Sequence, residues 1–162
     1  KLTAEQVRIL QEAVLRSPSS RSINPWEFVF VDDPALLEEL SRCKPHGAAF
    51  LKNAALGIVV CADETRSDVW VEDCSIASIL AQLTAQSLGL GSCWIQVRLR
   101  TRQDGGTAEA AVQKLLGLPP HIKVESIVAI GHPAEDKQGV PADRLDFGKI
   151  RTVQHDWGTP LL

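Results

Sequence analysis

Residues 55–62 read Ala-Leu-Gly-Ile-Val-Val-Cys-Ala, an almost unbroken apolar run in the first half of the chain. A run of this kind is typical of a strand that is buried on both of its faces. The sequence therefore predicts a central strand over 55–62, and the remaining elements are expected to enclose it.

Signals for helices and strands alternate along the chain on either side of this run. Thr3 and Gln6 form a capping-box pattern ahead of a first helix, and Pro34 opens a second helix after Asp33. The other predicted elements are helices over 69–90 and 108–116 and strands over 28–31, 92–97 and 124–130. The alternation is compatible with a doubly wound α/β fold, but the Gly-x-Gly-x-x-Gly fingerprint of such folds follows no early strand.

The long helix over 69–90 and the C-terminal segment 134–162 both suggest packing against another surface. The helix carries a wide apolar stripe, which consists of Ile76, Ile79, Leu80, Leu83 and Leu88. A helix that is apolar almost all round is buried inside a domain or at a subunit interface. Segment 134–162 is rich in proline, glycine and charge, so it is either disordered or laid across a partner.

Length and charge narrow the class of protein. A chain of 162 residues is expected to form one domain, here 1–162. Its net charge of -3 and pI of about 5.8 argue against a nucleic-acid partner, because phosphate backbones attract basic surfaces. The chain starts at Lys1 and contains no Met, so we expect it to be a fragment or to lack residues.

The cysteines and histidines show no spacing that indicates a metal or redox site. The four cysteines are Cys43, Cys61, Cys74 and Cys93. They form no Cys-x-x-Cys pair and lie in apolar settings, which predicts free, buried thiols in a reducing compartment. No His-x-x-x-His pair occurs, so no metal is expected. Without a recognisable signal peptide or membrane span, we expect a cytoplasmic protein.

The loop 16–28, Arg-Ser-Pro-Ser-Ser-Arg-Ser-Ile-Asn-Pro-Trp-Glu-Phe, is more polar and more specific than an ordinary connection. Ser19 and Ser20 can donate hydrogen bonds to phosphate or ribityl oxygens, and Arg21 can pair with an anion. Asn24 can bind an amide edge. The same residues also suit a turn whose side chains cap neighbouring backbone, and the residue types leave both interpretations open.

Two further segments contain possible contacts for a flat ligand. Residues 87–96 read Ser-Leu-Gly-Leu-Gly-Ser-Cys-Trp-Ile-Gln, in which glycines permit close backbone approach and Trp94 and Ile95 offer an apolar wall. Residues 127–133, Ile-Val-Ala-Ile-Gly-His-Pro, form a strand that ends in a turn. Taken alone, each segment is better explained as a part of the core.

Together, in this order and spacing, the three segments resemble the FMN-dependent nitroreductase family, and the resemblance covers most of the chain. The resemblance implies an α+β fold with a mainly antiparallel sheet flanked by helices. It also implies an intertwined homodimer with one FMN per active site in the dimer interface. The C-terminal extension 134–162 would then pack on the partner subunit.

The resemblance assigns flavin contacts by position. These are Pro18, Ser19, Ser20, Ser22 and Asn24 in the loop, Trp94, Ile95 and Gln96 against the flavin ring, and Arg144 at the phosphate. A backbone N–H of Ile95 or Gln96 would lie near flavin N5. The Arg-rich segment with which family members usually begin has no counterpart before Thr3. Either that segment is missing from this sequence, or the flavin is held weakly.

The function implied by the resemblance is an FMN-dependent oxidoreductase. NAD(P)H would reduce the flavin, and a nitroaromatic compound, a quinone or a similar acceptor would take the electrons in a ping-pong mechanism. No catalytic side chain is expected, because the flavin carries the chemistry. Two alternatives stay open: a family member with flavin-consuming or dehalogenating activity, and a flavin-binding protein without turnover.

Overall fold

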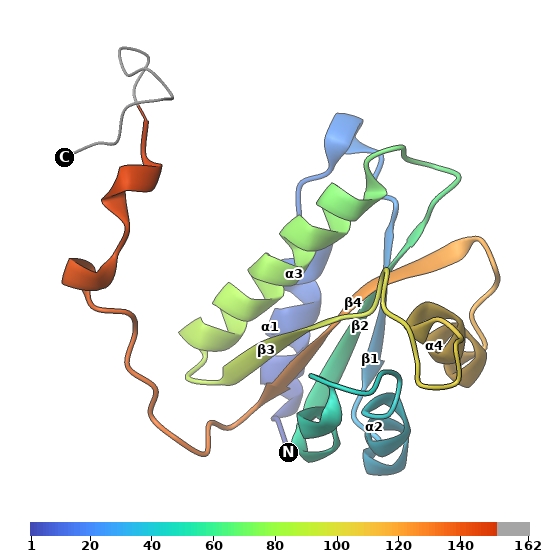
Figure 1. Ribbon diagram of the computed structural model, residues 1–162, viewed down its shortest axis with the longest axis horizontal. Coiled ribbons are helices and arrows are strands. Elements are labelled where there is room, and N and C mark those ends of the chain that lie inside the picture. Colours follow the sequence, from blue (N-terminus) through green and yellow to red (C-terminus); the bar gives the residue numbers. More distant parts are fainter. Residues whose placement is uncertain (152–162) are drawn as a thin grey trace.

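Four antiparallel strands form one sheet at the centre of the computed structural model, which describes residues 1–151 (Figure 1). The strands are β1 (Trp26–Val31), β2 (Leu56–Asp63), β3 (Gly91–Gln96) and β4 (Ile122–Gly131). Their spatial order is β1-β2-β4-β3, and all neighbouring strands run antiparallel. This topology excludes the parallel, doubly wound arrangement and confirms the α+β class with an antiparallel sheet.

Helices cover both faces of this sheet. One face carries α1 (Ala4–Leu15) and α3 (Trp70–Ser87), and the other carries α2 (Pro34–Leu40) and α4 (Ala108–Leu116) (Figure 1). Each face has its own hydrophobic cluster, because the side chains of α1 and α3 join one cluster and those of α2 and α4 join the other. Within residues 1–151, no helix has the length and apolar character needed to cross a membrane.

Strand β2 is the predicted central strand, shifted by one residue. Its side chains alternate between the two clusters: Val59 and Cys61 pack with α2 and α4, whereas Ile58 and Val60 pack with α1 and α3. Because successive side chains of a strand point to opposite faces, an uninterrupted apolar run is what a sheet covered on both faces requires. The strand therefore supplies the core of both layers.

Polar side chains fix where the helices begin. The capping box of α1 is complete, since the Gln6 backbone N–H donates to Thr3 Oγ1 at 3.1 Å and the Thr3 N–H donates to Gln6 Oε1 at 2.9 Å. Asp33 accepts from the Leu36 N–H at 2.9 Å, ahead of α2. These bonds satisfy backbone donors that have no partner inside the helix.

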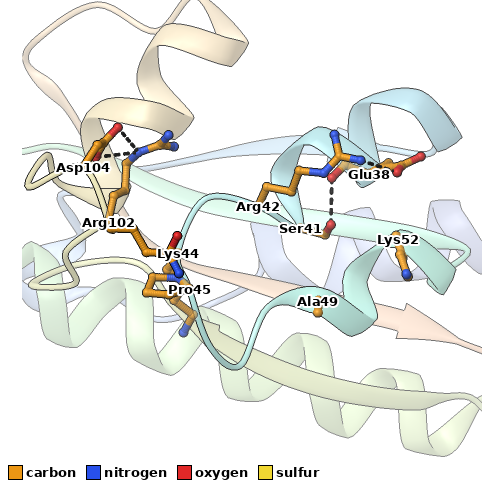
Figure 2. Close-up of a pocket in the computed structure, with 10 residues that line it drawn as sticks. Glu38, Ser41, Arg42, Lys44, Pro45, Ala49, Lys52, Arg102 and Asp104 are labelled. Carbon is orange, nitrogen blue, oxygen red and sulfur yellow. Dashed lines mark hydrogen bonds and ion pairs between the residues drawn. The ribbon is translucent and has the colours of Figure 1, made fainter.

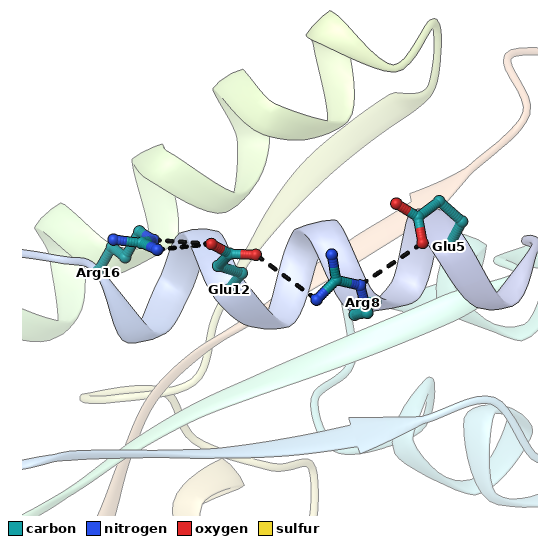
Figure 3. Close-up of polar contacts among 4 residues, drawn as sticks. All are labelled: Glu5, Arg8, Glu12 and Arg16. Atoms are coloured by element: carbon teal, nitrogen blue, oxygen red, sulfur yellow. Dashed lines mark hydrogen bonds and ion pairs between the residues drawn. The ribbon is translucent and has the colours of Figure 1, made fainter.

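The outer face of α1 carries a row of alternating charges (Figure 3). Glu5, Arg8, Glu12 and Arg16 lie three or four residues apart, and their ion pairs measure 3.5, 3.9 and 2.7 Å in chain order. The four side chains are 44–74% exposed, so solvent screens these ion pairs and they contribute little to stability. They mark the solvent side of α1, opposite the buried Leu10 and Val14.

Two apolar surfaces are exposed in the described part of the chain. Ile76, Ile79 and Leu83, on one side of α3, are 40, 48 and 59% exposed. The described part of the extension, 134–151, contains only two short 3-10 turns and runs away from the sheet (Figure 1). It exposes the apolar side chains of Val140, Leu145, Phe147 and Ile150. Residues 152–162 of the predicted extension lie outside the described part of the chain.

Candidate functional site

The loop between α1 and β1 folds back on itself through Ser19 and Asn24. The Ser19 hydroxyl donates to Asn24 Oδ1 at 2.7 Å, and the Asn24 backbone N–H donates to Ser19 Oγ at 2.8 Å. Arg21, Ser22 and Asn24 have φ values of 54, 54 and 51°. Few residues other than glycine adopt this left-handed conformation, and each such residue costs about 1–3 kcal/mol unless its surroundings hold it. The loop thus has a definite shape.

The first turn of α3 and the segment before it hold this loop in place. The Ser20 backbone N–H donates to the buried carboxylate of Asp73 at 2.8 Å, and the Arg66 guanidinium donates to the Ile23 carbonyl at 2.9 Å. Arg21 forms an ion pair with Asp68. The hydroxyls of Ser20 and Ser22 and the side-chain N–H groups of Asn24 form no hydrogen bond within the described residues, so they can bind a ligand.

The second predicted segment lies on β3, at the edge of the sheet. Ile95 is buried in the cluster beneath α2 and α4, so its side chain belongs to the core. Trp94 and Gln96 point to the other face, where the Trp94 Nε1–H donates to Gln96 Oε1 at 3.0 Å. The Gln96 side-chain amide donates in turn to the Arg98 carbonyl at 3.0 Å. Because β3 pairs only with β4 in the described chain, alternate backbone N–H groups face away from the sheet.

The first turn of α3 connects the two segments. Asp73 binds the loop through Ser20, and the guanidinium carbon of Arg98, just after β3, lies 5.7 Å from the centre of the Trp70 ring. This distance is suitable for a cation–π contact. Arg144 is not part of this group: it lies exposed in the extension, which runs away from the sheet in Figure 1. Pro18 is exposed at the start of the loop.

Glu125 is a buried carboxyl in this region that the sequence analysis did not single out. Only 4% of it is exposed, and among residues 1–151 its Oε2 atom has no hydrogen-bond partner. It lies in β4 opposite the irregularity between Val60 and Cys61, where Val60 pairs with Ser126 and Cys61 with Val124. Burial raises the pKa of Glu125, although the nearby positive charge of Arg98 opposes the increase. One charged residue inside an apolar strand was the signal that could have revealed it.

The two cavities described in the chain lie on the opposite side of the sheet, beside α2 and α4. One, of about 540 Å³, lies between the end of α2, residues 44–52 and the loop 102–104 (Figure 2). The other, of about 620 Å³, lies between α2, the same loop and α4. None of the nine predicted flavin contacts lines either cavity. The predicted flavin residues thus lie outside both of these cavities, with Ile95 buried in the core and Arg144 in the extension.

The cysteines provide no alternative site. Cys43, Cys61 and Cys74 are buried free thiols, and burial raises the pKa of Cys61 to about 12, which keeps it protonated and unreactive. Cys93 is exposed, so the prediction that all four are buried was wrong for this residue. It lies on the edge strand β3, one side of which is open to solvent. Among the described residues, no three His, Cys, Asp or Glu side chains come together as a metal site.

Comparison with known proteins places the chain in a family. A family model described as the nitroreductase family matches residues 42–132, which is more than half of the chain. The chain belongs to the nitroreductase family. The resemblance stated from the sequence is thereby confirmed.

Relatives and solved structures of this family match almost the whole chain. A protein of Archaeoglobus fulgidus named as an NADH dehydrogenase/NAD(P)H nitroreductase is 35% identical, over 97% of this chain and 88% of its own length. An FMN-dependent nitroreductase from Clostridium difficile is 41% identical, with a TM-score of 0.93 over 96% of this chain and 90% of that one. A protein from Bacteroides thetaiotaomicron with a similar name is 31% identical, with a TM-score of 0.84 over 96% and 88%.

Proposed function

We propose that this protein is an FMN-dependent oxidoreductase, which passes electrons from NAD(P)H to a nitroaromatic compound, a quinone or a similar acceptor. The main support is the likeness to an FMN-dependent nitroreductase over 96% of the chain, at 41% identity and a TM-score of 0.93. Relatives named NAD(P)H nitroreductase and NADPH-flavin oxidoreductase support the choice of electron donor.

The donor groups of the loop fit the polar part of FMN. The hydroxyls of Ser20 and Ser22 and the amide of Asn24 would hydrogen-bond to the ribityl chain and to the ring edge. Ser19 has a different role, because its only hydroxyl hydrogen is already donated to Asn24. It would shape the loop, and Ser20, Ser22 and Asn24 would make the direct contacts.

Strand β3 would supply the surface against the flavin ring. Trp94 offers an apolar wall, and its hydrogen bond to Gln96 fixes the orientation of both side chains. An outward backbone N–H of this edge strand would donate to a ring nitrogen. Bound FMN supplies hydride acceptance and transfer, while these residues orient the ring and keep one face open. The donor and the acceptor would use that face in turn, and we therefore propose a ping-pong order.

We also propose that the site is completed in an intertwined homodimer. The exposed residues Ile76, Ile79 and Leu83 form an apolar surface of the kind that marks a protein interface. The extension exposes further apolar side chains and carries Arg144 away from its own sheet. In a dimer, the extension would cover the second subunit and bring Arg144 to the flavin phosphate.

One observation favours a second candidate, a flavin-binding protein without turnover. Both guanidiniums of the loop are already paired with carboxylates, Arg16 with Glu12 and Arg21 with Asp68. A phosphate would have to compete with these partners, which favours weaker retention of FMN. Reduction of bound FMN by NAD(P)H separates the two candidates, because only the oxidoreductase would bleach the flavin absorption and then recover it with an acceptor.

Ser20→Ala tests the assignment of the loop. The Ser20 backbone N–H bonds to Asp73 and stays in the variant, so only the free hydroxyl is lost. We expect FMN affinity to fall about 2–10-fold, the effect of one hydrogen bond, with unchanged stability of the apoprotein. Affinity would be measured by absorption after FMN addition and desalting.

Ser87→Ala is the matched control, since Ser87 lies at the far end of α3 and bonds to the Thr84 carbonyl. Unchanged FMN affinity in Ser20→Ala, or an equal loss in Ser87→Ala, would refute the assignment.

A further inference from the structure

The smaller of the two cavities gathers positive charge in an acidic protein. Six charged side chains line it: the cations Arg42, Lys44, Lys52 and Arg102 and the carboxylates Glu38 and Asp104. Four cations against two carboxylates leave a local charge of +2, although the whole chain has a net charge of -3. Like charges repel, so such a concentration is unfavourable unless a compensating anion is present.

The carboxylates neutralise only the two arginines. Arg42 pairs with Glu38, and Arg102 pairs with Asp104 at 3.1 Å (Figure 2). Neither Lys44 nor Lys52 forms an ion pair with any described residue. Lys44 is only partly exposed, and this partial burial lowers its pKa, with the positive charge of Arg100 acting in the same direction. An anion bound here would relieve that unfavourable environment.

Three separate elements bring these cations together. Cations near a helix C-terminus stabilise its dipole, which could explain Arg42 and Lys44 but not the other two. Lys52 comes from the 3-10 turn Ala49–Asn53, and Arg102 from the loop after β3. That loop is closed by backbone bonds, since the Arg102 N–H donates to the Gly106 carbonyl at 2.8 Å and Thr101 bridges Thr107. Arg102 is thus presented by a fixed turn.

We propose that this cavity binds the phosphate groups of a small phosphorylated molecule, at a site separate from the predicted flavin site. Lysine ammonium groups attract phosphate as point charges, and arginine forks bind its oxygens in pairs. The pyrrolidine ring of Pro45 and the methyl group of Ala49 offer apolar contact for the rest of the ligand. A volume of about 540 Å³ is typical of ligand pockets.

The proposal is tested with pyrophosphate on the protein saturated with FMN and, separately, on the flavin-free protein. Binding would be measured by calorimetry against sodium chloride of equal ionic strength. We expect pyrophosphate to bind in both preparations and the double variant Lys44→Gln/Lys52→Gln to weaken it about ten-fold or more. Pyrophosphate binding to the flavin-free protein tests this site alone. Its outcome does not depend on whether the proposed flavin function is correct.

Lys1→Gln/Lys137→Gln is the control, since it removes the same charge from residues outside the cavity. The proposal is overturned if pyrophosphate binds no better than chloride, or if both double variants weaken binding equally.

Two sources of phosphate are then distinguished with ADP. If the ligand is the ADP portion of the pyridine nucleotide, ADP competes with NAD(P)H. The double variant Lys44→Gln/Lys52→Gln then raises the KM for NAD(P)H. If the ligand is another phosphorylated metabolite, pyrophosphate binding depends on both lysines but KM stays unchanged.

Discussion

At the scale of single residues, Glu125 is a buried carboxyl that lowers the stability of the folded chain. A carboxyl that is 4% exposed and has one unpartnered oxygen costs about 1–3 kcal/mol relative to a satisfied group. Neighbouring charged side chains act on the pKa of Glu125 in both directions. The positive charge of Arg98 partly offsets the burial, whereas the neighbouring carboxylates of Glu109 and Glu72 raise its pKa further.

Glu125→Gln should stabilise the protein at neutral and alkaline pH. The folded-state pKa of Glu125 is raised above its ordinary value, so its stabilising contribution is complete at low pH and is lost as pH rises through that pKa. Glutamine does not ionise. We expect the variant to be more stable than the wild type near pH 8, because it has no charge to bury, and the difference to shrink as the pH is lowered through the pKa of Glu125.

Urea unfolding across this range measures the effect, and Glu27→Gln on β1 is the control because Glu27 is exposed. A stability difference that does not change with pH would show that ionisation of Glu125 is not the cause.

At the scale of elements, we expect the N-terminal cap of α1 to contribute more to stability than its exposed ion pairs. Thr3→Ala removes the side chain that accepts from Gln6 and should lower the free energy of unfolding by about 1 kcal/mol. Arg8→Ala removes two exposed ion pairs and should change it by less than about 0.5 kcal/mol. Both are measured by urea unfolding. Equal losses in the two variants would mean that the row of charges, rather than the cap, holds the helix start.

The elements were predictable because their signals are local. Thr3, Asp33 and the apolar run 55–62 each determine structure within a few residues, and the observed bounds differ from the predicted ones by only a few positions. Strand order was not predictable from alternation, because β4 inserts between β2 and β3 although β3 precedes it in the chain. The family resemblance, not periodicity, supplied the antiparallel sheet.

The candidate site was less predictable for a related reason. The loop 16–28 was identified from its residue types, but the pairing of Ser19 with Asn24 and of Arg21 with Asp68 depends on a folded backbone. The cavity of about 540 Å³ is lined by both Lys44 and Arg102, which are far apart in the sequence. No sequence motif could therefore have predicted it.

At the scale of the whole molecule, the exposed apolar side of α3 is the surface that we propose as the dimer interface. If it is the dimer interface, charges placed there should separate the subunits. We expect Ile79→Lys/Leu83→Lys to sediment as a monomer, because the lysines would have to be buried without partners. Leu99→Lys is the control, since Leu99 is 77% exposed and lies outside α3. A stable dimer in the α3 variant would contradict the proposed interface.

If Trp94 lies beside the flavin ring as proposed, the fluorescence of the protein would report on cofactor binding. The chain has four tryptophans and no tyrosine, so its ultraviolet emission comes from indole rings alone. Trp94 lies on the open edge strand, in the segment predicted to face the flavin ring, and Trp70 lies beside Arg98 at the start of α3. Flavins absorb in the region where indole emits, so a bound ring would quench this light by energy transfer. Loading and release of the cofactor could then be followed in real time without a dye or label.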